Sequence, residues 1–316
     1  MKAVAGILLF CAVVAAAPLF TNSGYLLNAL IMTLYAALLG QAWNILGGFG
    51  GQFSFGHAVF FGTGAYAMAV LQVKFGWNAW AALPAALALG AAVGALIGAL
   101  SFRYGLKGSY FALVTLAFAE VFRILSNTFE FTGAGVGLMV PLKESAVDMQ
   151  FGKTGFLYLI LALLTVAMLA TAWLRNSRYG AWLQAVRDNE DSAAALGVNV
   201  FRVKLGAIMI SGALMAAGGA FYVQLFHYID PHIAYGPAVS VEALLGPIIG
   251  GMGTLWGPLL GAAVLHGLGE LTRAVMGDVP GVNLIAYGVV LILMVTFLPR
   301  GIIGLFHRKS KDAPRA

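Results

Sequence analysis

Three polar side chains lie in the densest glycine stretch of the chain, LGGFGGQFSFGHAVFFGTGAY, residues 46–66. They are Gln52, Ser54 and His57. A histidine here could relay protons, but a hydrogen-bonded packing role near the membrane interface is the favoured interpretation for His57. Glycine permits an interrupted helix, and non-helical backbone at membrane depth requires protein or a water-filled cavity beside it. Lining or gating of a pathway and simple packing therefore both remain open for this stretch.

Glu120 and Arg123 are charged residues inside an apolar segment, SYFALVTLAFAEVFRIL. They are three residues apart and so share one helical face. At a rise of 1.5 Å per residue, Glu120 lies about 16 Å beyond Ser109, close to the middle of a bilayer. The sequence leaves two roles open, a structural ion pair and a polar point beside a translocation route. Tyr110 and Thr115 of the same segment are further candidates for that route.

Catalytic and metal-binding patterns are absent from the sequence. FGKTG, residues 151–155, lacks the earlier glycine and the strand-to-helix setting of a phosphate loop. We find no convincing paired carboxylates, Ser/His/Asp set or metal-ligand spacing, and the single cysteine, Cys11, excludes an internal disulfide. We therefore expect that the chain is not an enzyme and binds no cofactor or metal itself.

The composition places the chain in a membrane, because 61% of the residues are hydrophobic and only 9% are charged. Long apolar runs recur, and each must be a helix, since lipid offers the backbone no hydrogen-bond partners. The predicted fold is an all-α, polytopic transmembrane domain covering 1–316. The predicted spans are 3–20, 25–46, 55–73, 79–101, 109–128, 155–174, 205–226, 238–252, 256–272 and 282–298. The first is expected to be retained rather than cleaved as a signal peptide, and the eighth to be broken or partly buried.

The distribution of Lys and Arg predicts the orientation. With the N-terminus in the cytoplasm, thirteen lie inside and four outside, a strong positive-inside bias. Both termini are then cytoplasmic, including the basic tail 301–316. The net charge of +6 does not form one face that would indicate nucleic acid. The inner residues are Lys2, Arg103, Lys107, Arg175, Arg178, Arg187, Arg202, Lys204, Arg300, Arg308, Lys309, Lys311 and Arg315, and the outer ones Lys74, Lys143, Lys153 and Arg273.

A charged segment, residues 175–204, follows the sixth predicted span on the cytoplasmic side. It is typical of two short helices at an angle: Asp188 or Asn189 can cap the second, Gly197 can end it, and Asn199 can cap the next span. A solvated connector is the alternative, but this segment is long for a connector. We favour a docking surface for a cytoplasmic partner. Its candidate contact residues are Tyr179, Trp182, Arg187, Asp188, Glu190, Asp191, Ala194, Leu196 and Gly197.

Five stretches, in order, resemble the M-type permease subunit of bacterial branched-chain amino acid ABC importers. They are GGFGGQFSFGHAVFFGTGAY, LKGSYFALVTLAFAEVFRIL, SRYGAWLQAVRDNEDSAAALGVNVFRVKL, IIGGMGTLWGPLLGAAVL and FLPRGIIGLF. The resemblance implies a type II importer fold of about ten helices in the inner membrane. It also implies a sister permease, two cytoplasmic ATPase subunits that bind ATP and Mg²⁺, and a periplasmic amino-acid-binding protein.

The resemblance further implies that Tyr179–Val198 contains the coupling helices that dock into the ATPases. Val136, in TGAGVGL, departs from the Asn or Asp common in the family, which leaves the exact substrate open. The leading interpretation is a permease for branched-chain or other hydrophobic amino acids. The alternatives are a urea or short-amide permease, a proton-coupled secondary transporter using Glu120, and a membrane-embedded enzyme built on His57 and Glu120.

Overall fold

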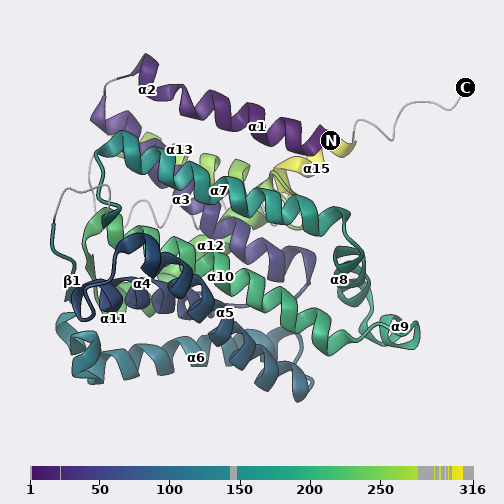
Figure 1. The fold of residues 1–316 in the computed structure, drawn as a ribbon. Helices are drawn as coiled ribbons and strands as arrows, with labels where there is room; N and C mark the ends of the chain where they lie inside the picture. Colours follow the sequence, from purple (N-terminus) through teal and green to yellow (C-terminus); the bar gives the residue numbers. More distant parts are fainter. Residues whose placement is uncertain are drawn as a thin grey trace, which may run out of the picture.

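The computed structural model describes residues 2–21, 23–142, 148–276 and 301–308, together with 288, 292, 296 and 298, and this part of the chain is almost entirely helical (Figure 1). The helices are α1 Lys2–Ala15, α2 Ala17–Phe20, α3 Gly24–Asn44, α4 Ala58–Val73, α5 Ala79–Arg103, α6 Gly108–Thr128, α7 Lys153–Asn176, α8 Arg178–Asp188, α9 Glu190–Ala195, α10 Val200–Phe226, α11 Pro231–Tyr235, α12 Pro237–Gly250, α13 Gly257–Met276 and α15 Gly301–Arg308. A π-helix, Ile45–Phe49, continues α3. Two 3₁₀ turns, Glu130–Thr132 and Ala134–Val136, precede the strand β1 Leu138–Met139.

Within the described residues, seven helical segments are long and apolar enough to cross a membrane. They are Ala3–Phe20, Gly24–Phe49, Ala79–Arg103, Gly108–Thr128, Lys153–Asn176, Val200–Phe226 and Pro231–Gly250. Each of the first nine spans predicted from the sequence contains a helix, although α4 has only 16 residues. The tenth predicted span, 282–298, lies outside the described residues except for isolated positions. The chain is a multi-pass helical membrane protein.

The centre of the bundle is formed around α10, which contacts α3, α4 and α5. Glycines allow this close packing because a side chain would meet backbone atoms of the neighbouring helix. A Cβ on Gly219 of α10 would lie 2.0 Å from the carbonyl oxygen of Phe61, and one on Gly64 of α4 would lie 2.1 Å from that of Ala216. The glycine stretches of the sequence thus include helix contacts at van der Waals distance.

The helices α1 and α6 lie at the two edges of the bundle (Figure 1). Only 11% of the residues in the most apolar part of the first span are buried, and 22% in that of α6. The corresponding fraction of α3 with its π-helical extension is 78%. The outer faces of α1 and α6 are therefore available to lipid or to another subunit.

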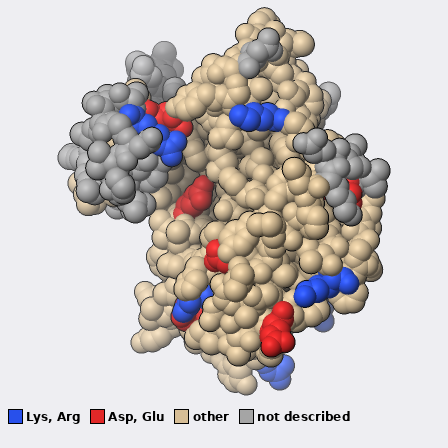
Figure 2. All heavy atoms as spheres, turned by 90° about the vertical axis from the view of Figure 1, so that its left-hand side faces the viewer, with Lys and Arg blue, Asp and Glu red and all other residues tan. Residues whose placement is uncertain are grey.

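The bundle has two distinct ends. One carries α8 and α9, and we call it the elbow end; the elbow is residues 177–199, which connect α7 to α10 within the charged segment 175–204. The other carries a short antiparallel ladder between β1 and β2 Tyr228–Ile229, in which Leu138 pairs with Ile229, and we call it the hairpin end. Figure 2 looks onto the hairpin end, where uncharged residues form most of the visible surface. α10 runs the whole distance between the two ends (Figure 1).

The helices are interrupted before α4 and between α11 and α12. Residues 51–56 contain no helix, and α4 begins only at Ala58, so the third predicted span starts later than its apolar pattern suggests. Another interruption lies just before the eighth predicted span, 238–252, where α11 ends at Tyr235 and α12 begins at Pro237 with Gly236 in an extended conformation. α12 itself is unbroken from Pro237 to Gly250, and 67% of the most apolar part of Pro231–Gly250 is buried, which agrees with the partly buried alternative. Pro237 occupies the first helical position, where a missing N–H group costs nothing.

Candidate functional site

The elbow is a capped structure of two short helices. The hydroxyl of Ser177 accepts a hydrogen bond from the Gly180 N–H (3.0 Å) at the start of α8. Asn189, rather than Asp188, caps α9 by accepting from the Ser192 N–H (2.9 Å). Gly197 ends α9 with a φ of 86°, a left-handed conformation that favours glycine. Asn199 caps α10 by accepting from the Arg202 N–H (3.0 Å). The predicted local structure of this segment is confirmed.

One side of the elbow is attached to the transmembrane bundle. Leu183, Val186 and Ala193 are buried against it. The Tyr179 hydroxyl donates to the carbonyl oxygen of Val203 in the first turn of α10 (2.6 Å), and burial raises the pKa of Tyr179 to about 12. The Arg187 guanidinium donates to the carbonyl oxygen of Gly48 in the π-helix (3.2 Å). The elbow is therefore joined directly to the ends of both central helices, α3 and α10.

Glu190 forms the strongest polar attachment of the elbow. Its carboxylate forms ion pairs with Lys204 of α10 and with Lys107, which precedes α6 (3.2 Å to Lys107 Nζ). The Lys204 side chain is only 4% exposed, and its ammonium lies 5.3 Å from the centre of the Phe102 ring at the end of α5. Partial burial opposes ionisation of Glu190, but the two lysines outweigh it and hold its pKa below the usual value. One carboxylate thus links α9 to α10 and to the connection between α5 and α6.

The opposite side of the elbow is open. Leu196 is 85% exposed and Trp182 is 48% exposed, which is unusual for such large apolar side chains on one small segment. A groove of about 420 Å³ lies between them, with Arg202 in its wall. The other predicted contact residues that lie on the exposed surface are Arg187, Asp188, Asp191, Ala194 and Gly197, although Arg187 also reaches Gly48. Asp188 also forms an ion pair with Arg187 (3.0 Å).

The structure therefore divides the nine predicted elbow residues into two groups. Tyr179, Arg187 and Glu190 hold the elbow on the bundle, while the other six form an outward surface. Sequence reasoning could not make this division because helices as short as α8 and α9 show little apolar periodicity. The apolar side chains of the elbow are likewise divided, since Val186 and Ala193 are buried whereas Ala185 and Leu196 are exposed.

His57 lies in the interior of the subunit and is fully buried. Its Nε2 is 2.9 Å from the Ser211 hydroxyl, which donates to the carbonyl oxygen of Ala42 (2.7 Å), so Nε2 carries the hydrogen. Its Nδ1 lies 3.0 Å from the Ser54 hydroxyl. A neutral imidazole with both nitrogens bonded ties residues 51–57 to α3 and α10. This geometry matches the packing interpretation of His57.

Gln52 and Thr115 are also buried, at 6% and 2% exposure. The Thr115 hydroxyl donates to the carbonyl oxygen of Ala112 in its own helix (2.8 Å). A Cβ on Gly56 would lie 1.9 Å from the Thr115 carbonyl oxygen, so α6 touches the interrupted segment at this point. Gln52, Ser54, His57 and Thr115 are therefore in one neighbourhood, inside the subunit.

Glu120 and Arg123 form the ion pair that their spacing predicts, with 2.9 Å between Arg123 Nε and Glu120 Oε2. The Glu120 side chain is 53% exposed within the subunit, on the outer face of α6. Arg123 also lies 3.4 Å from Nδ1 of His232 in α11. Tyr110 is 74% exposed on the same helix. The seven pathway candidates thus belong to two places, an interior group and the open face of α6.

A contact that the sequence did not reveal joins the glycine stretch 46–66 to a second glycine-rich stretch, IIGGMGTLWGPLLGAAVL, residues 248–265. We call these two stretches the glycine clusters. Asn44, fully buried at the end of α3, accepts from the Gly253 N–H (2.8 Å) and donates to the carbonyl oxygen of Thr254 (2.9 Å). Gly253 has a φ of 69°. Because Arg187 binds Gly48 in the adjacent turn, the elbow and both glycine clusters meet at one place. The sequence feature that could have indicated this contact is the amide side chain of Asn44, which comes just before the first glycine cluster.

The fold and the elbow define a class of protein: a polytopic helical membrane protein with a folded segment at one end that exposes two large apolar side chains. The chain belongs to the family of permease components of branched-chain amino acid transport systems, because the model of that family matches residues 25–297. Its relatives are transport components rather than enzymes.

Curated relatives agree with this assignment. The chain is 29% identical to the high-affinity branched-chain amino acid transport permease LivM of Escherichia coli, over 89% of this chain and 70% of LivM. It is 29% identical to the permease LivH of E. coli over 44% of each chain. It is also 29% identical to the nucleoside ABC transporter permease NupC of Lactococcus lactis, over 54% of this chain and 56% of NupC. No solved structure gives a significant match.

Proposed function

We propose that this chain is one permease subunit of an ATP-driven importer for branched-chain or other hydrophobic amino acids in the bacterial inner membrane. Its partners are a sister permease, two cytoplasmic ATPase subunits that bind ATP and Mg²⁺, and a periplasmic binding protein. The similarity to LivM over most of both chains supports the substrate class. The exposed elbow is the observation that carries the mechanism, because a permease without a nucleotide site must receive work from a partner.

The orientation follows from the charges at the two ends. Arg103 ends α5, Lys107 precedes α6, Arg175 lies in the last turn of α7, and Arg202 and Lys204 lie in the first turns of α10. All of these termini are at the elbow end. Basic residues that flank spans favour the cytoplasmic side, so the elbow faces the cytoplasm in this proposal. The hairpin end then faces the periplasm and the binding protein.

The open side of the elbow docks the ATPase. Its large apolar side chains, Leu196 and Trp182, line a groove together with Arg202, and Asp188 and Asp191 are exposed on the same segment. An apolar centre with a polar rim is the usual anatomy of a protein interface. The polar attachments on the opposite side transmit the movement of the docked ATPase to α3, α10 and the α5–α6 connection.

The open face of α6 faces the sister permease along the translocation pathway in this proposal. Glu120 is half exposed within the subunit, at a depth where lipid is a costly neighbour for a carboxylate. Contact with a second subunit or with a water-filled route removes that cost.

Co-purification tests the docking assignment. Leu196→Asp should abolish retention of the ATPase subunits by the tagged permease, because it places a charge at the centre of the apolar patch. Val136→Asp is the matched control, since Val136 is 81% exposed but lies at the hairpin end. Retention of the ATPases by Leu196→Asp at the level of Val136→Asp would refute the assignment.

Transport tests the substrate class. ATP-driven uptake of radiolabelled leucine by the reconstituted complex should be suppressed by unlabelled isoleucine and valine, and not by a nucleoside, a sugar or urea. The comparison with NupC makes the nucleoside the most informative competitor. Uptake by the permease chains alone under a pH gradient would instead identify a secondary transporter.

A further inference from the structure

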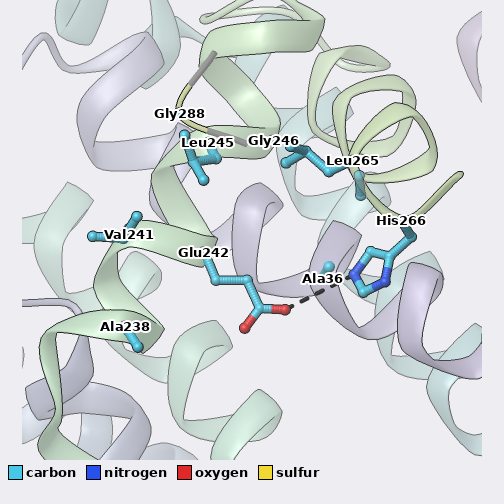
Figure 3. A pocket seen from close by; sticks show the side chains of 10 residues that line it. Ala36, Ala238, Val241, Glu242, Leu245, Gly246, Leu265, His266 and Gly288 are labelled. Carbon is cyan, nitrogen blue, oxygen red and sulfur yellow. Dashed lines mark ion pairs between the residues drawn. The ribbon is translucent and has the colours of Figure 1, made fainter. Parts of the chain in front are cut away.

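A pocket of about 420 Å³ lies between α12 and α13, with α3 behind it, and it takes no part in the contacts described above (Figure 3). Its walls are almost entirely apolar and include Ala36, Val241, Leu245 and Leu265. A volume of this size is within the range of small-molecule sites. It is open to a ligand rather than filled by the described side chains.

Two polar side chains converge in this pocket. Glu242 of α12 and His266 of α13 point toward each other across it, with 3.9 Å between Glu242 Oε1 and His266 Nε2 (Figure 3). That distance is too long for a hydrogen bond. The side chains are 38% and 24% exposed within the subunit, so both can be reached from the pocket.

A carboxylate within a membrane span requires a partner or water, and Glu242 has only this loose pairing among the described residues. Glu270, one turn beyond His266 on α13, differs: it bonds the Tyr25 hydroxyl and pairs with Arg273. Of these two carboxylates, that of Glu242 can therefore accept hydrogen bonds from a ligand.

We infer that this pocket is a binding site for a zwitterionic amino acid with an apolar side chain. The ligand's ammonium binds Glu242, its carboxylate binds the His266 ring, and its side chain contacts Val241, Leu245 and Leu265. This inference rests on the proposed function, because it names a place along the route of the same substrate.

Charge balance favours a zwitterion over a simple cation or anion. When His266 carries a proton, the pair is neutral overall, and so is the ligand. The ammonium of the ligand faces the Glu242 carboxylate, and its carboxylate faces the protonated His266 ring. Binding therefore brings no net charge into the apolar surroundings. A free amine or a free carboxylate would leave one member of the pair without its counter-charge.

The pocket is also connected to the open face of α6. α11 contacts both α6 and α12, and His232 of α11 lies beside Arg123. One short helix, α11, therefore separates the helix that carries the Glu120–Arg123 pair from the helix that carries Glu242.

Photolabelling with a diazirine analogue of leucine tests the inference on the assembled complex. Labelled positions should fall within 238–246 and 262–266, and excess leucine should compete, whereas N-acetyl-leucine, which lacks the ammonium, should not. Glu242→Gln should lower labelling about tenfold, equivalent to about 1.4 kcal/mol of binding free energy, because it keeps the shape but removes the charge. Glu130→Gln is the control and should label as the wild type does, because Glu130 is exposed in a 3₁₀ turn at the hairpin end.

Two outcomes would overturn the inference. One is wild-type labelling of these positions by Glu242→Gln. The other is labelling confined to α6 or to other subunits, including the case in which a sister-permease segment fills the pocket. ATP-driven leucine uptake by the wild-type complex is measured separately. Uptake with no labelling of the pocket rejects the inference and leaves the proposed function standing, whereas no uptake rejects the proposed function itself.

Discussion

The link between Glu190 and Lys204 should contribute a large part of the attachment between the elbow and the bundle. Lys204 is 4% exposed, so Glu190→Gln leaves a buried ammonium with only the Phe102 ring and the repulsion of Lys107 nearby. Loss of one partner of a buried pair costs about 3–5 kcal/mol. We expect about 3 kcal/mol here, since a cation–π contact retains about 1 kcal/mol.

Lys204→Met should cost less, because Glu190 is 18% exposed and keeps its ion pair with Lys107. A remaining pair of that kind is partly solvated, and we expect a loss of about 1 kcal/mol. The double variant, Glu190→Gln with Lys204→Met, buries no unpaired charge and should resemble Lys204→Met. The interaction free energy from the double-mutant cycle should then be about 2–3 kcal/mol.

The assay is the free energy of unfolding of the purified permease by SDS titration, together with ATP-driven uptake by the complex. Glu190→Gln should reduce uptake while the ATPases still co-purify, because the outward surface is intact. Asp191→Asn is the matched control, since it removes the neighbouring carboxylate, which lies on the exposed side. Additive effects of the two single changes, or equal effects of Glu190→Gln and Asp191→Asn, would refute the reasoning.

Three further predictions concern packing, pH and a hydrogen bond. Gly219→Ala should destabilise the permease by about 2 kcal/mol or more, because the added methyl group clashes with the Phe61 carbonyl. Gly267→Ala is the control and should be neutral or stabilising, because no other atom lies within 4 Å of the added methyl group. Equal free energies of unfolding for the two variants in SDS titration would contradict this prediction. The pKa of Glu190 is lowered in the folded state, so its contribution is complete above the usual Glu value of 4.5 and is lost as the pH falls through the lower folded value. The difference in the free energy of unfolding between the wild type and Glu190→Gln should therefore shrink as the pH falls below 4.5. A difference that stays constant with pH would contradict this prediction. Tyr179→Phe should cost about 1 kcal/mol through loss of its bond to Val203, and an unchanged unfolding curve would show that the bond contributes nothing.

Local chemistry was predictable from the sequence where a few neighbouring residues decide the outcome. The caps at Asn189 and Asn199, the turn at Gly197 and the Glu120–Arg123 pair depend on spacings of two to four residues, and all are present. The glycine content before α4 indicated an interrupted helix, but it did not indicate that α4 begins at Ala58.

Contacts between distant segments were not predictable from one sequence. The bond from Asn44 to Gly253 and that from Arg187 to Gly48 depend on how helices far apart in the chain are packed. The inward position of Glu190 and the outward position of Asp191 could not be distinguished, because the two acids are adjacent on a helix of six residues. The approach of Glu242 to His266 across the pocket likewise depends on how α12 packs against α13.

The placement of the ATPase on the elbow is tested most directly by site-specific photocrosslinking in the assembled complex. Benzoylphenylalanine at position 196, where the native Leu196 is 85% exposed, should crosslink to an ATPase subunit on irradiation. The same photoreactive residue at position 136, equally exposed at the hairpin end, should give no ATPase product. ATPase crosslinks from position 136, or their absence from position 196 in a complex that hydrolyses ATP, would contradict the account.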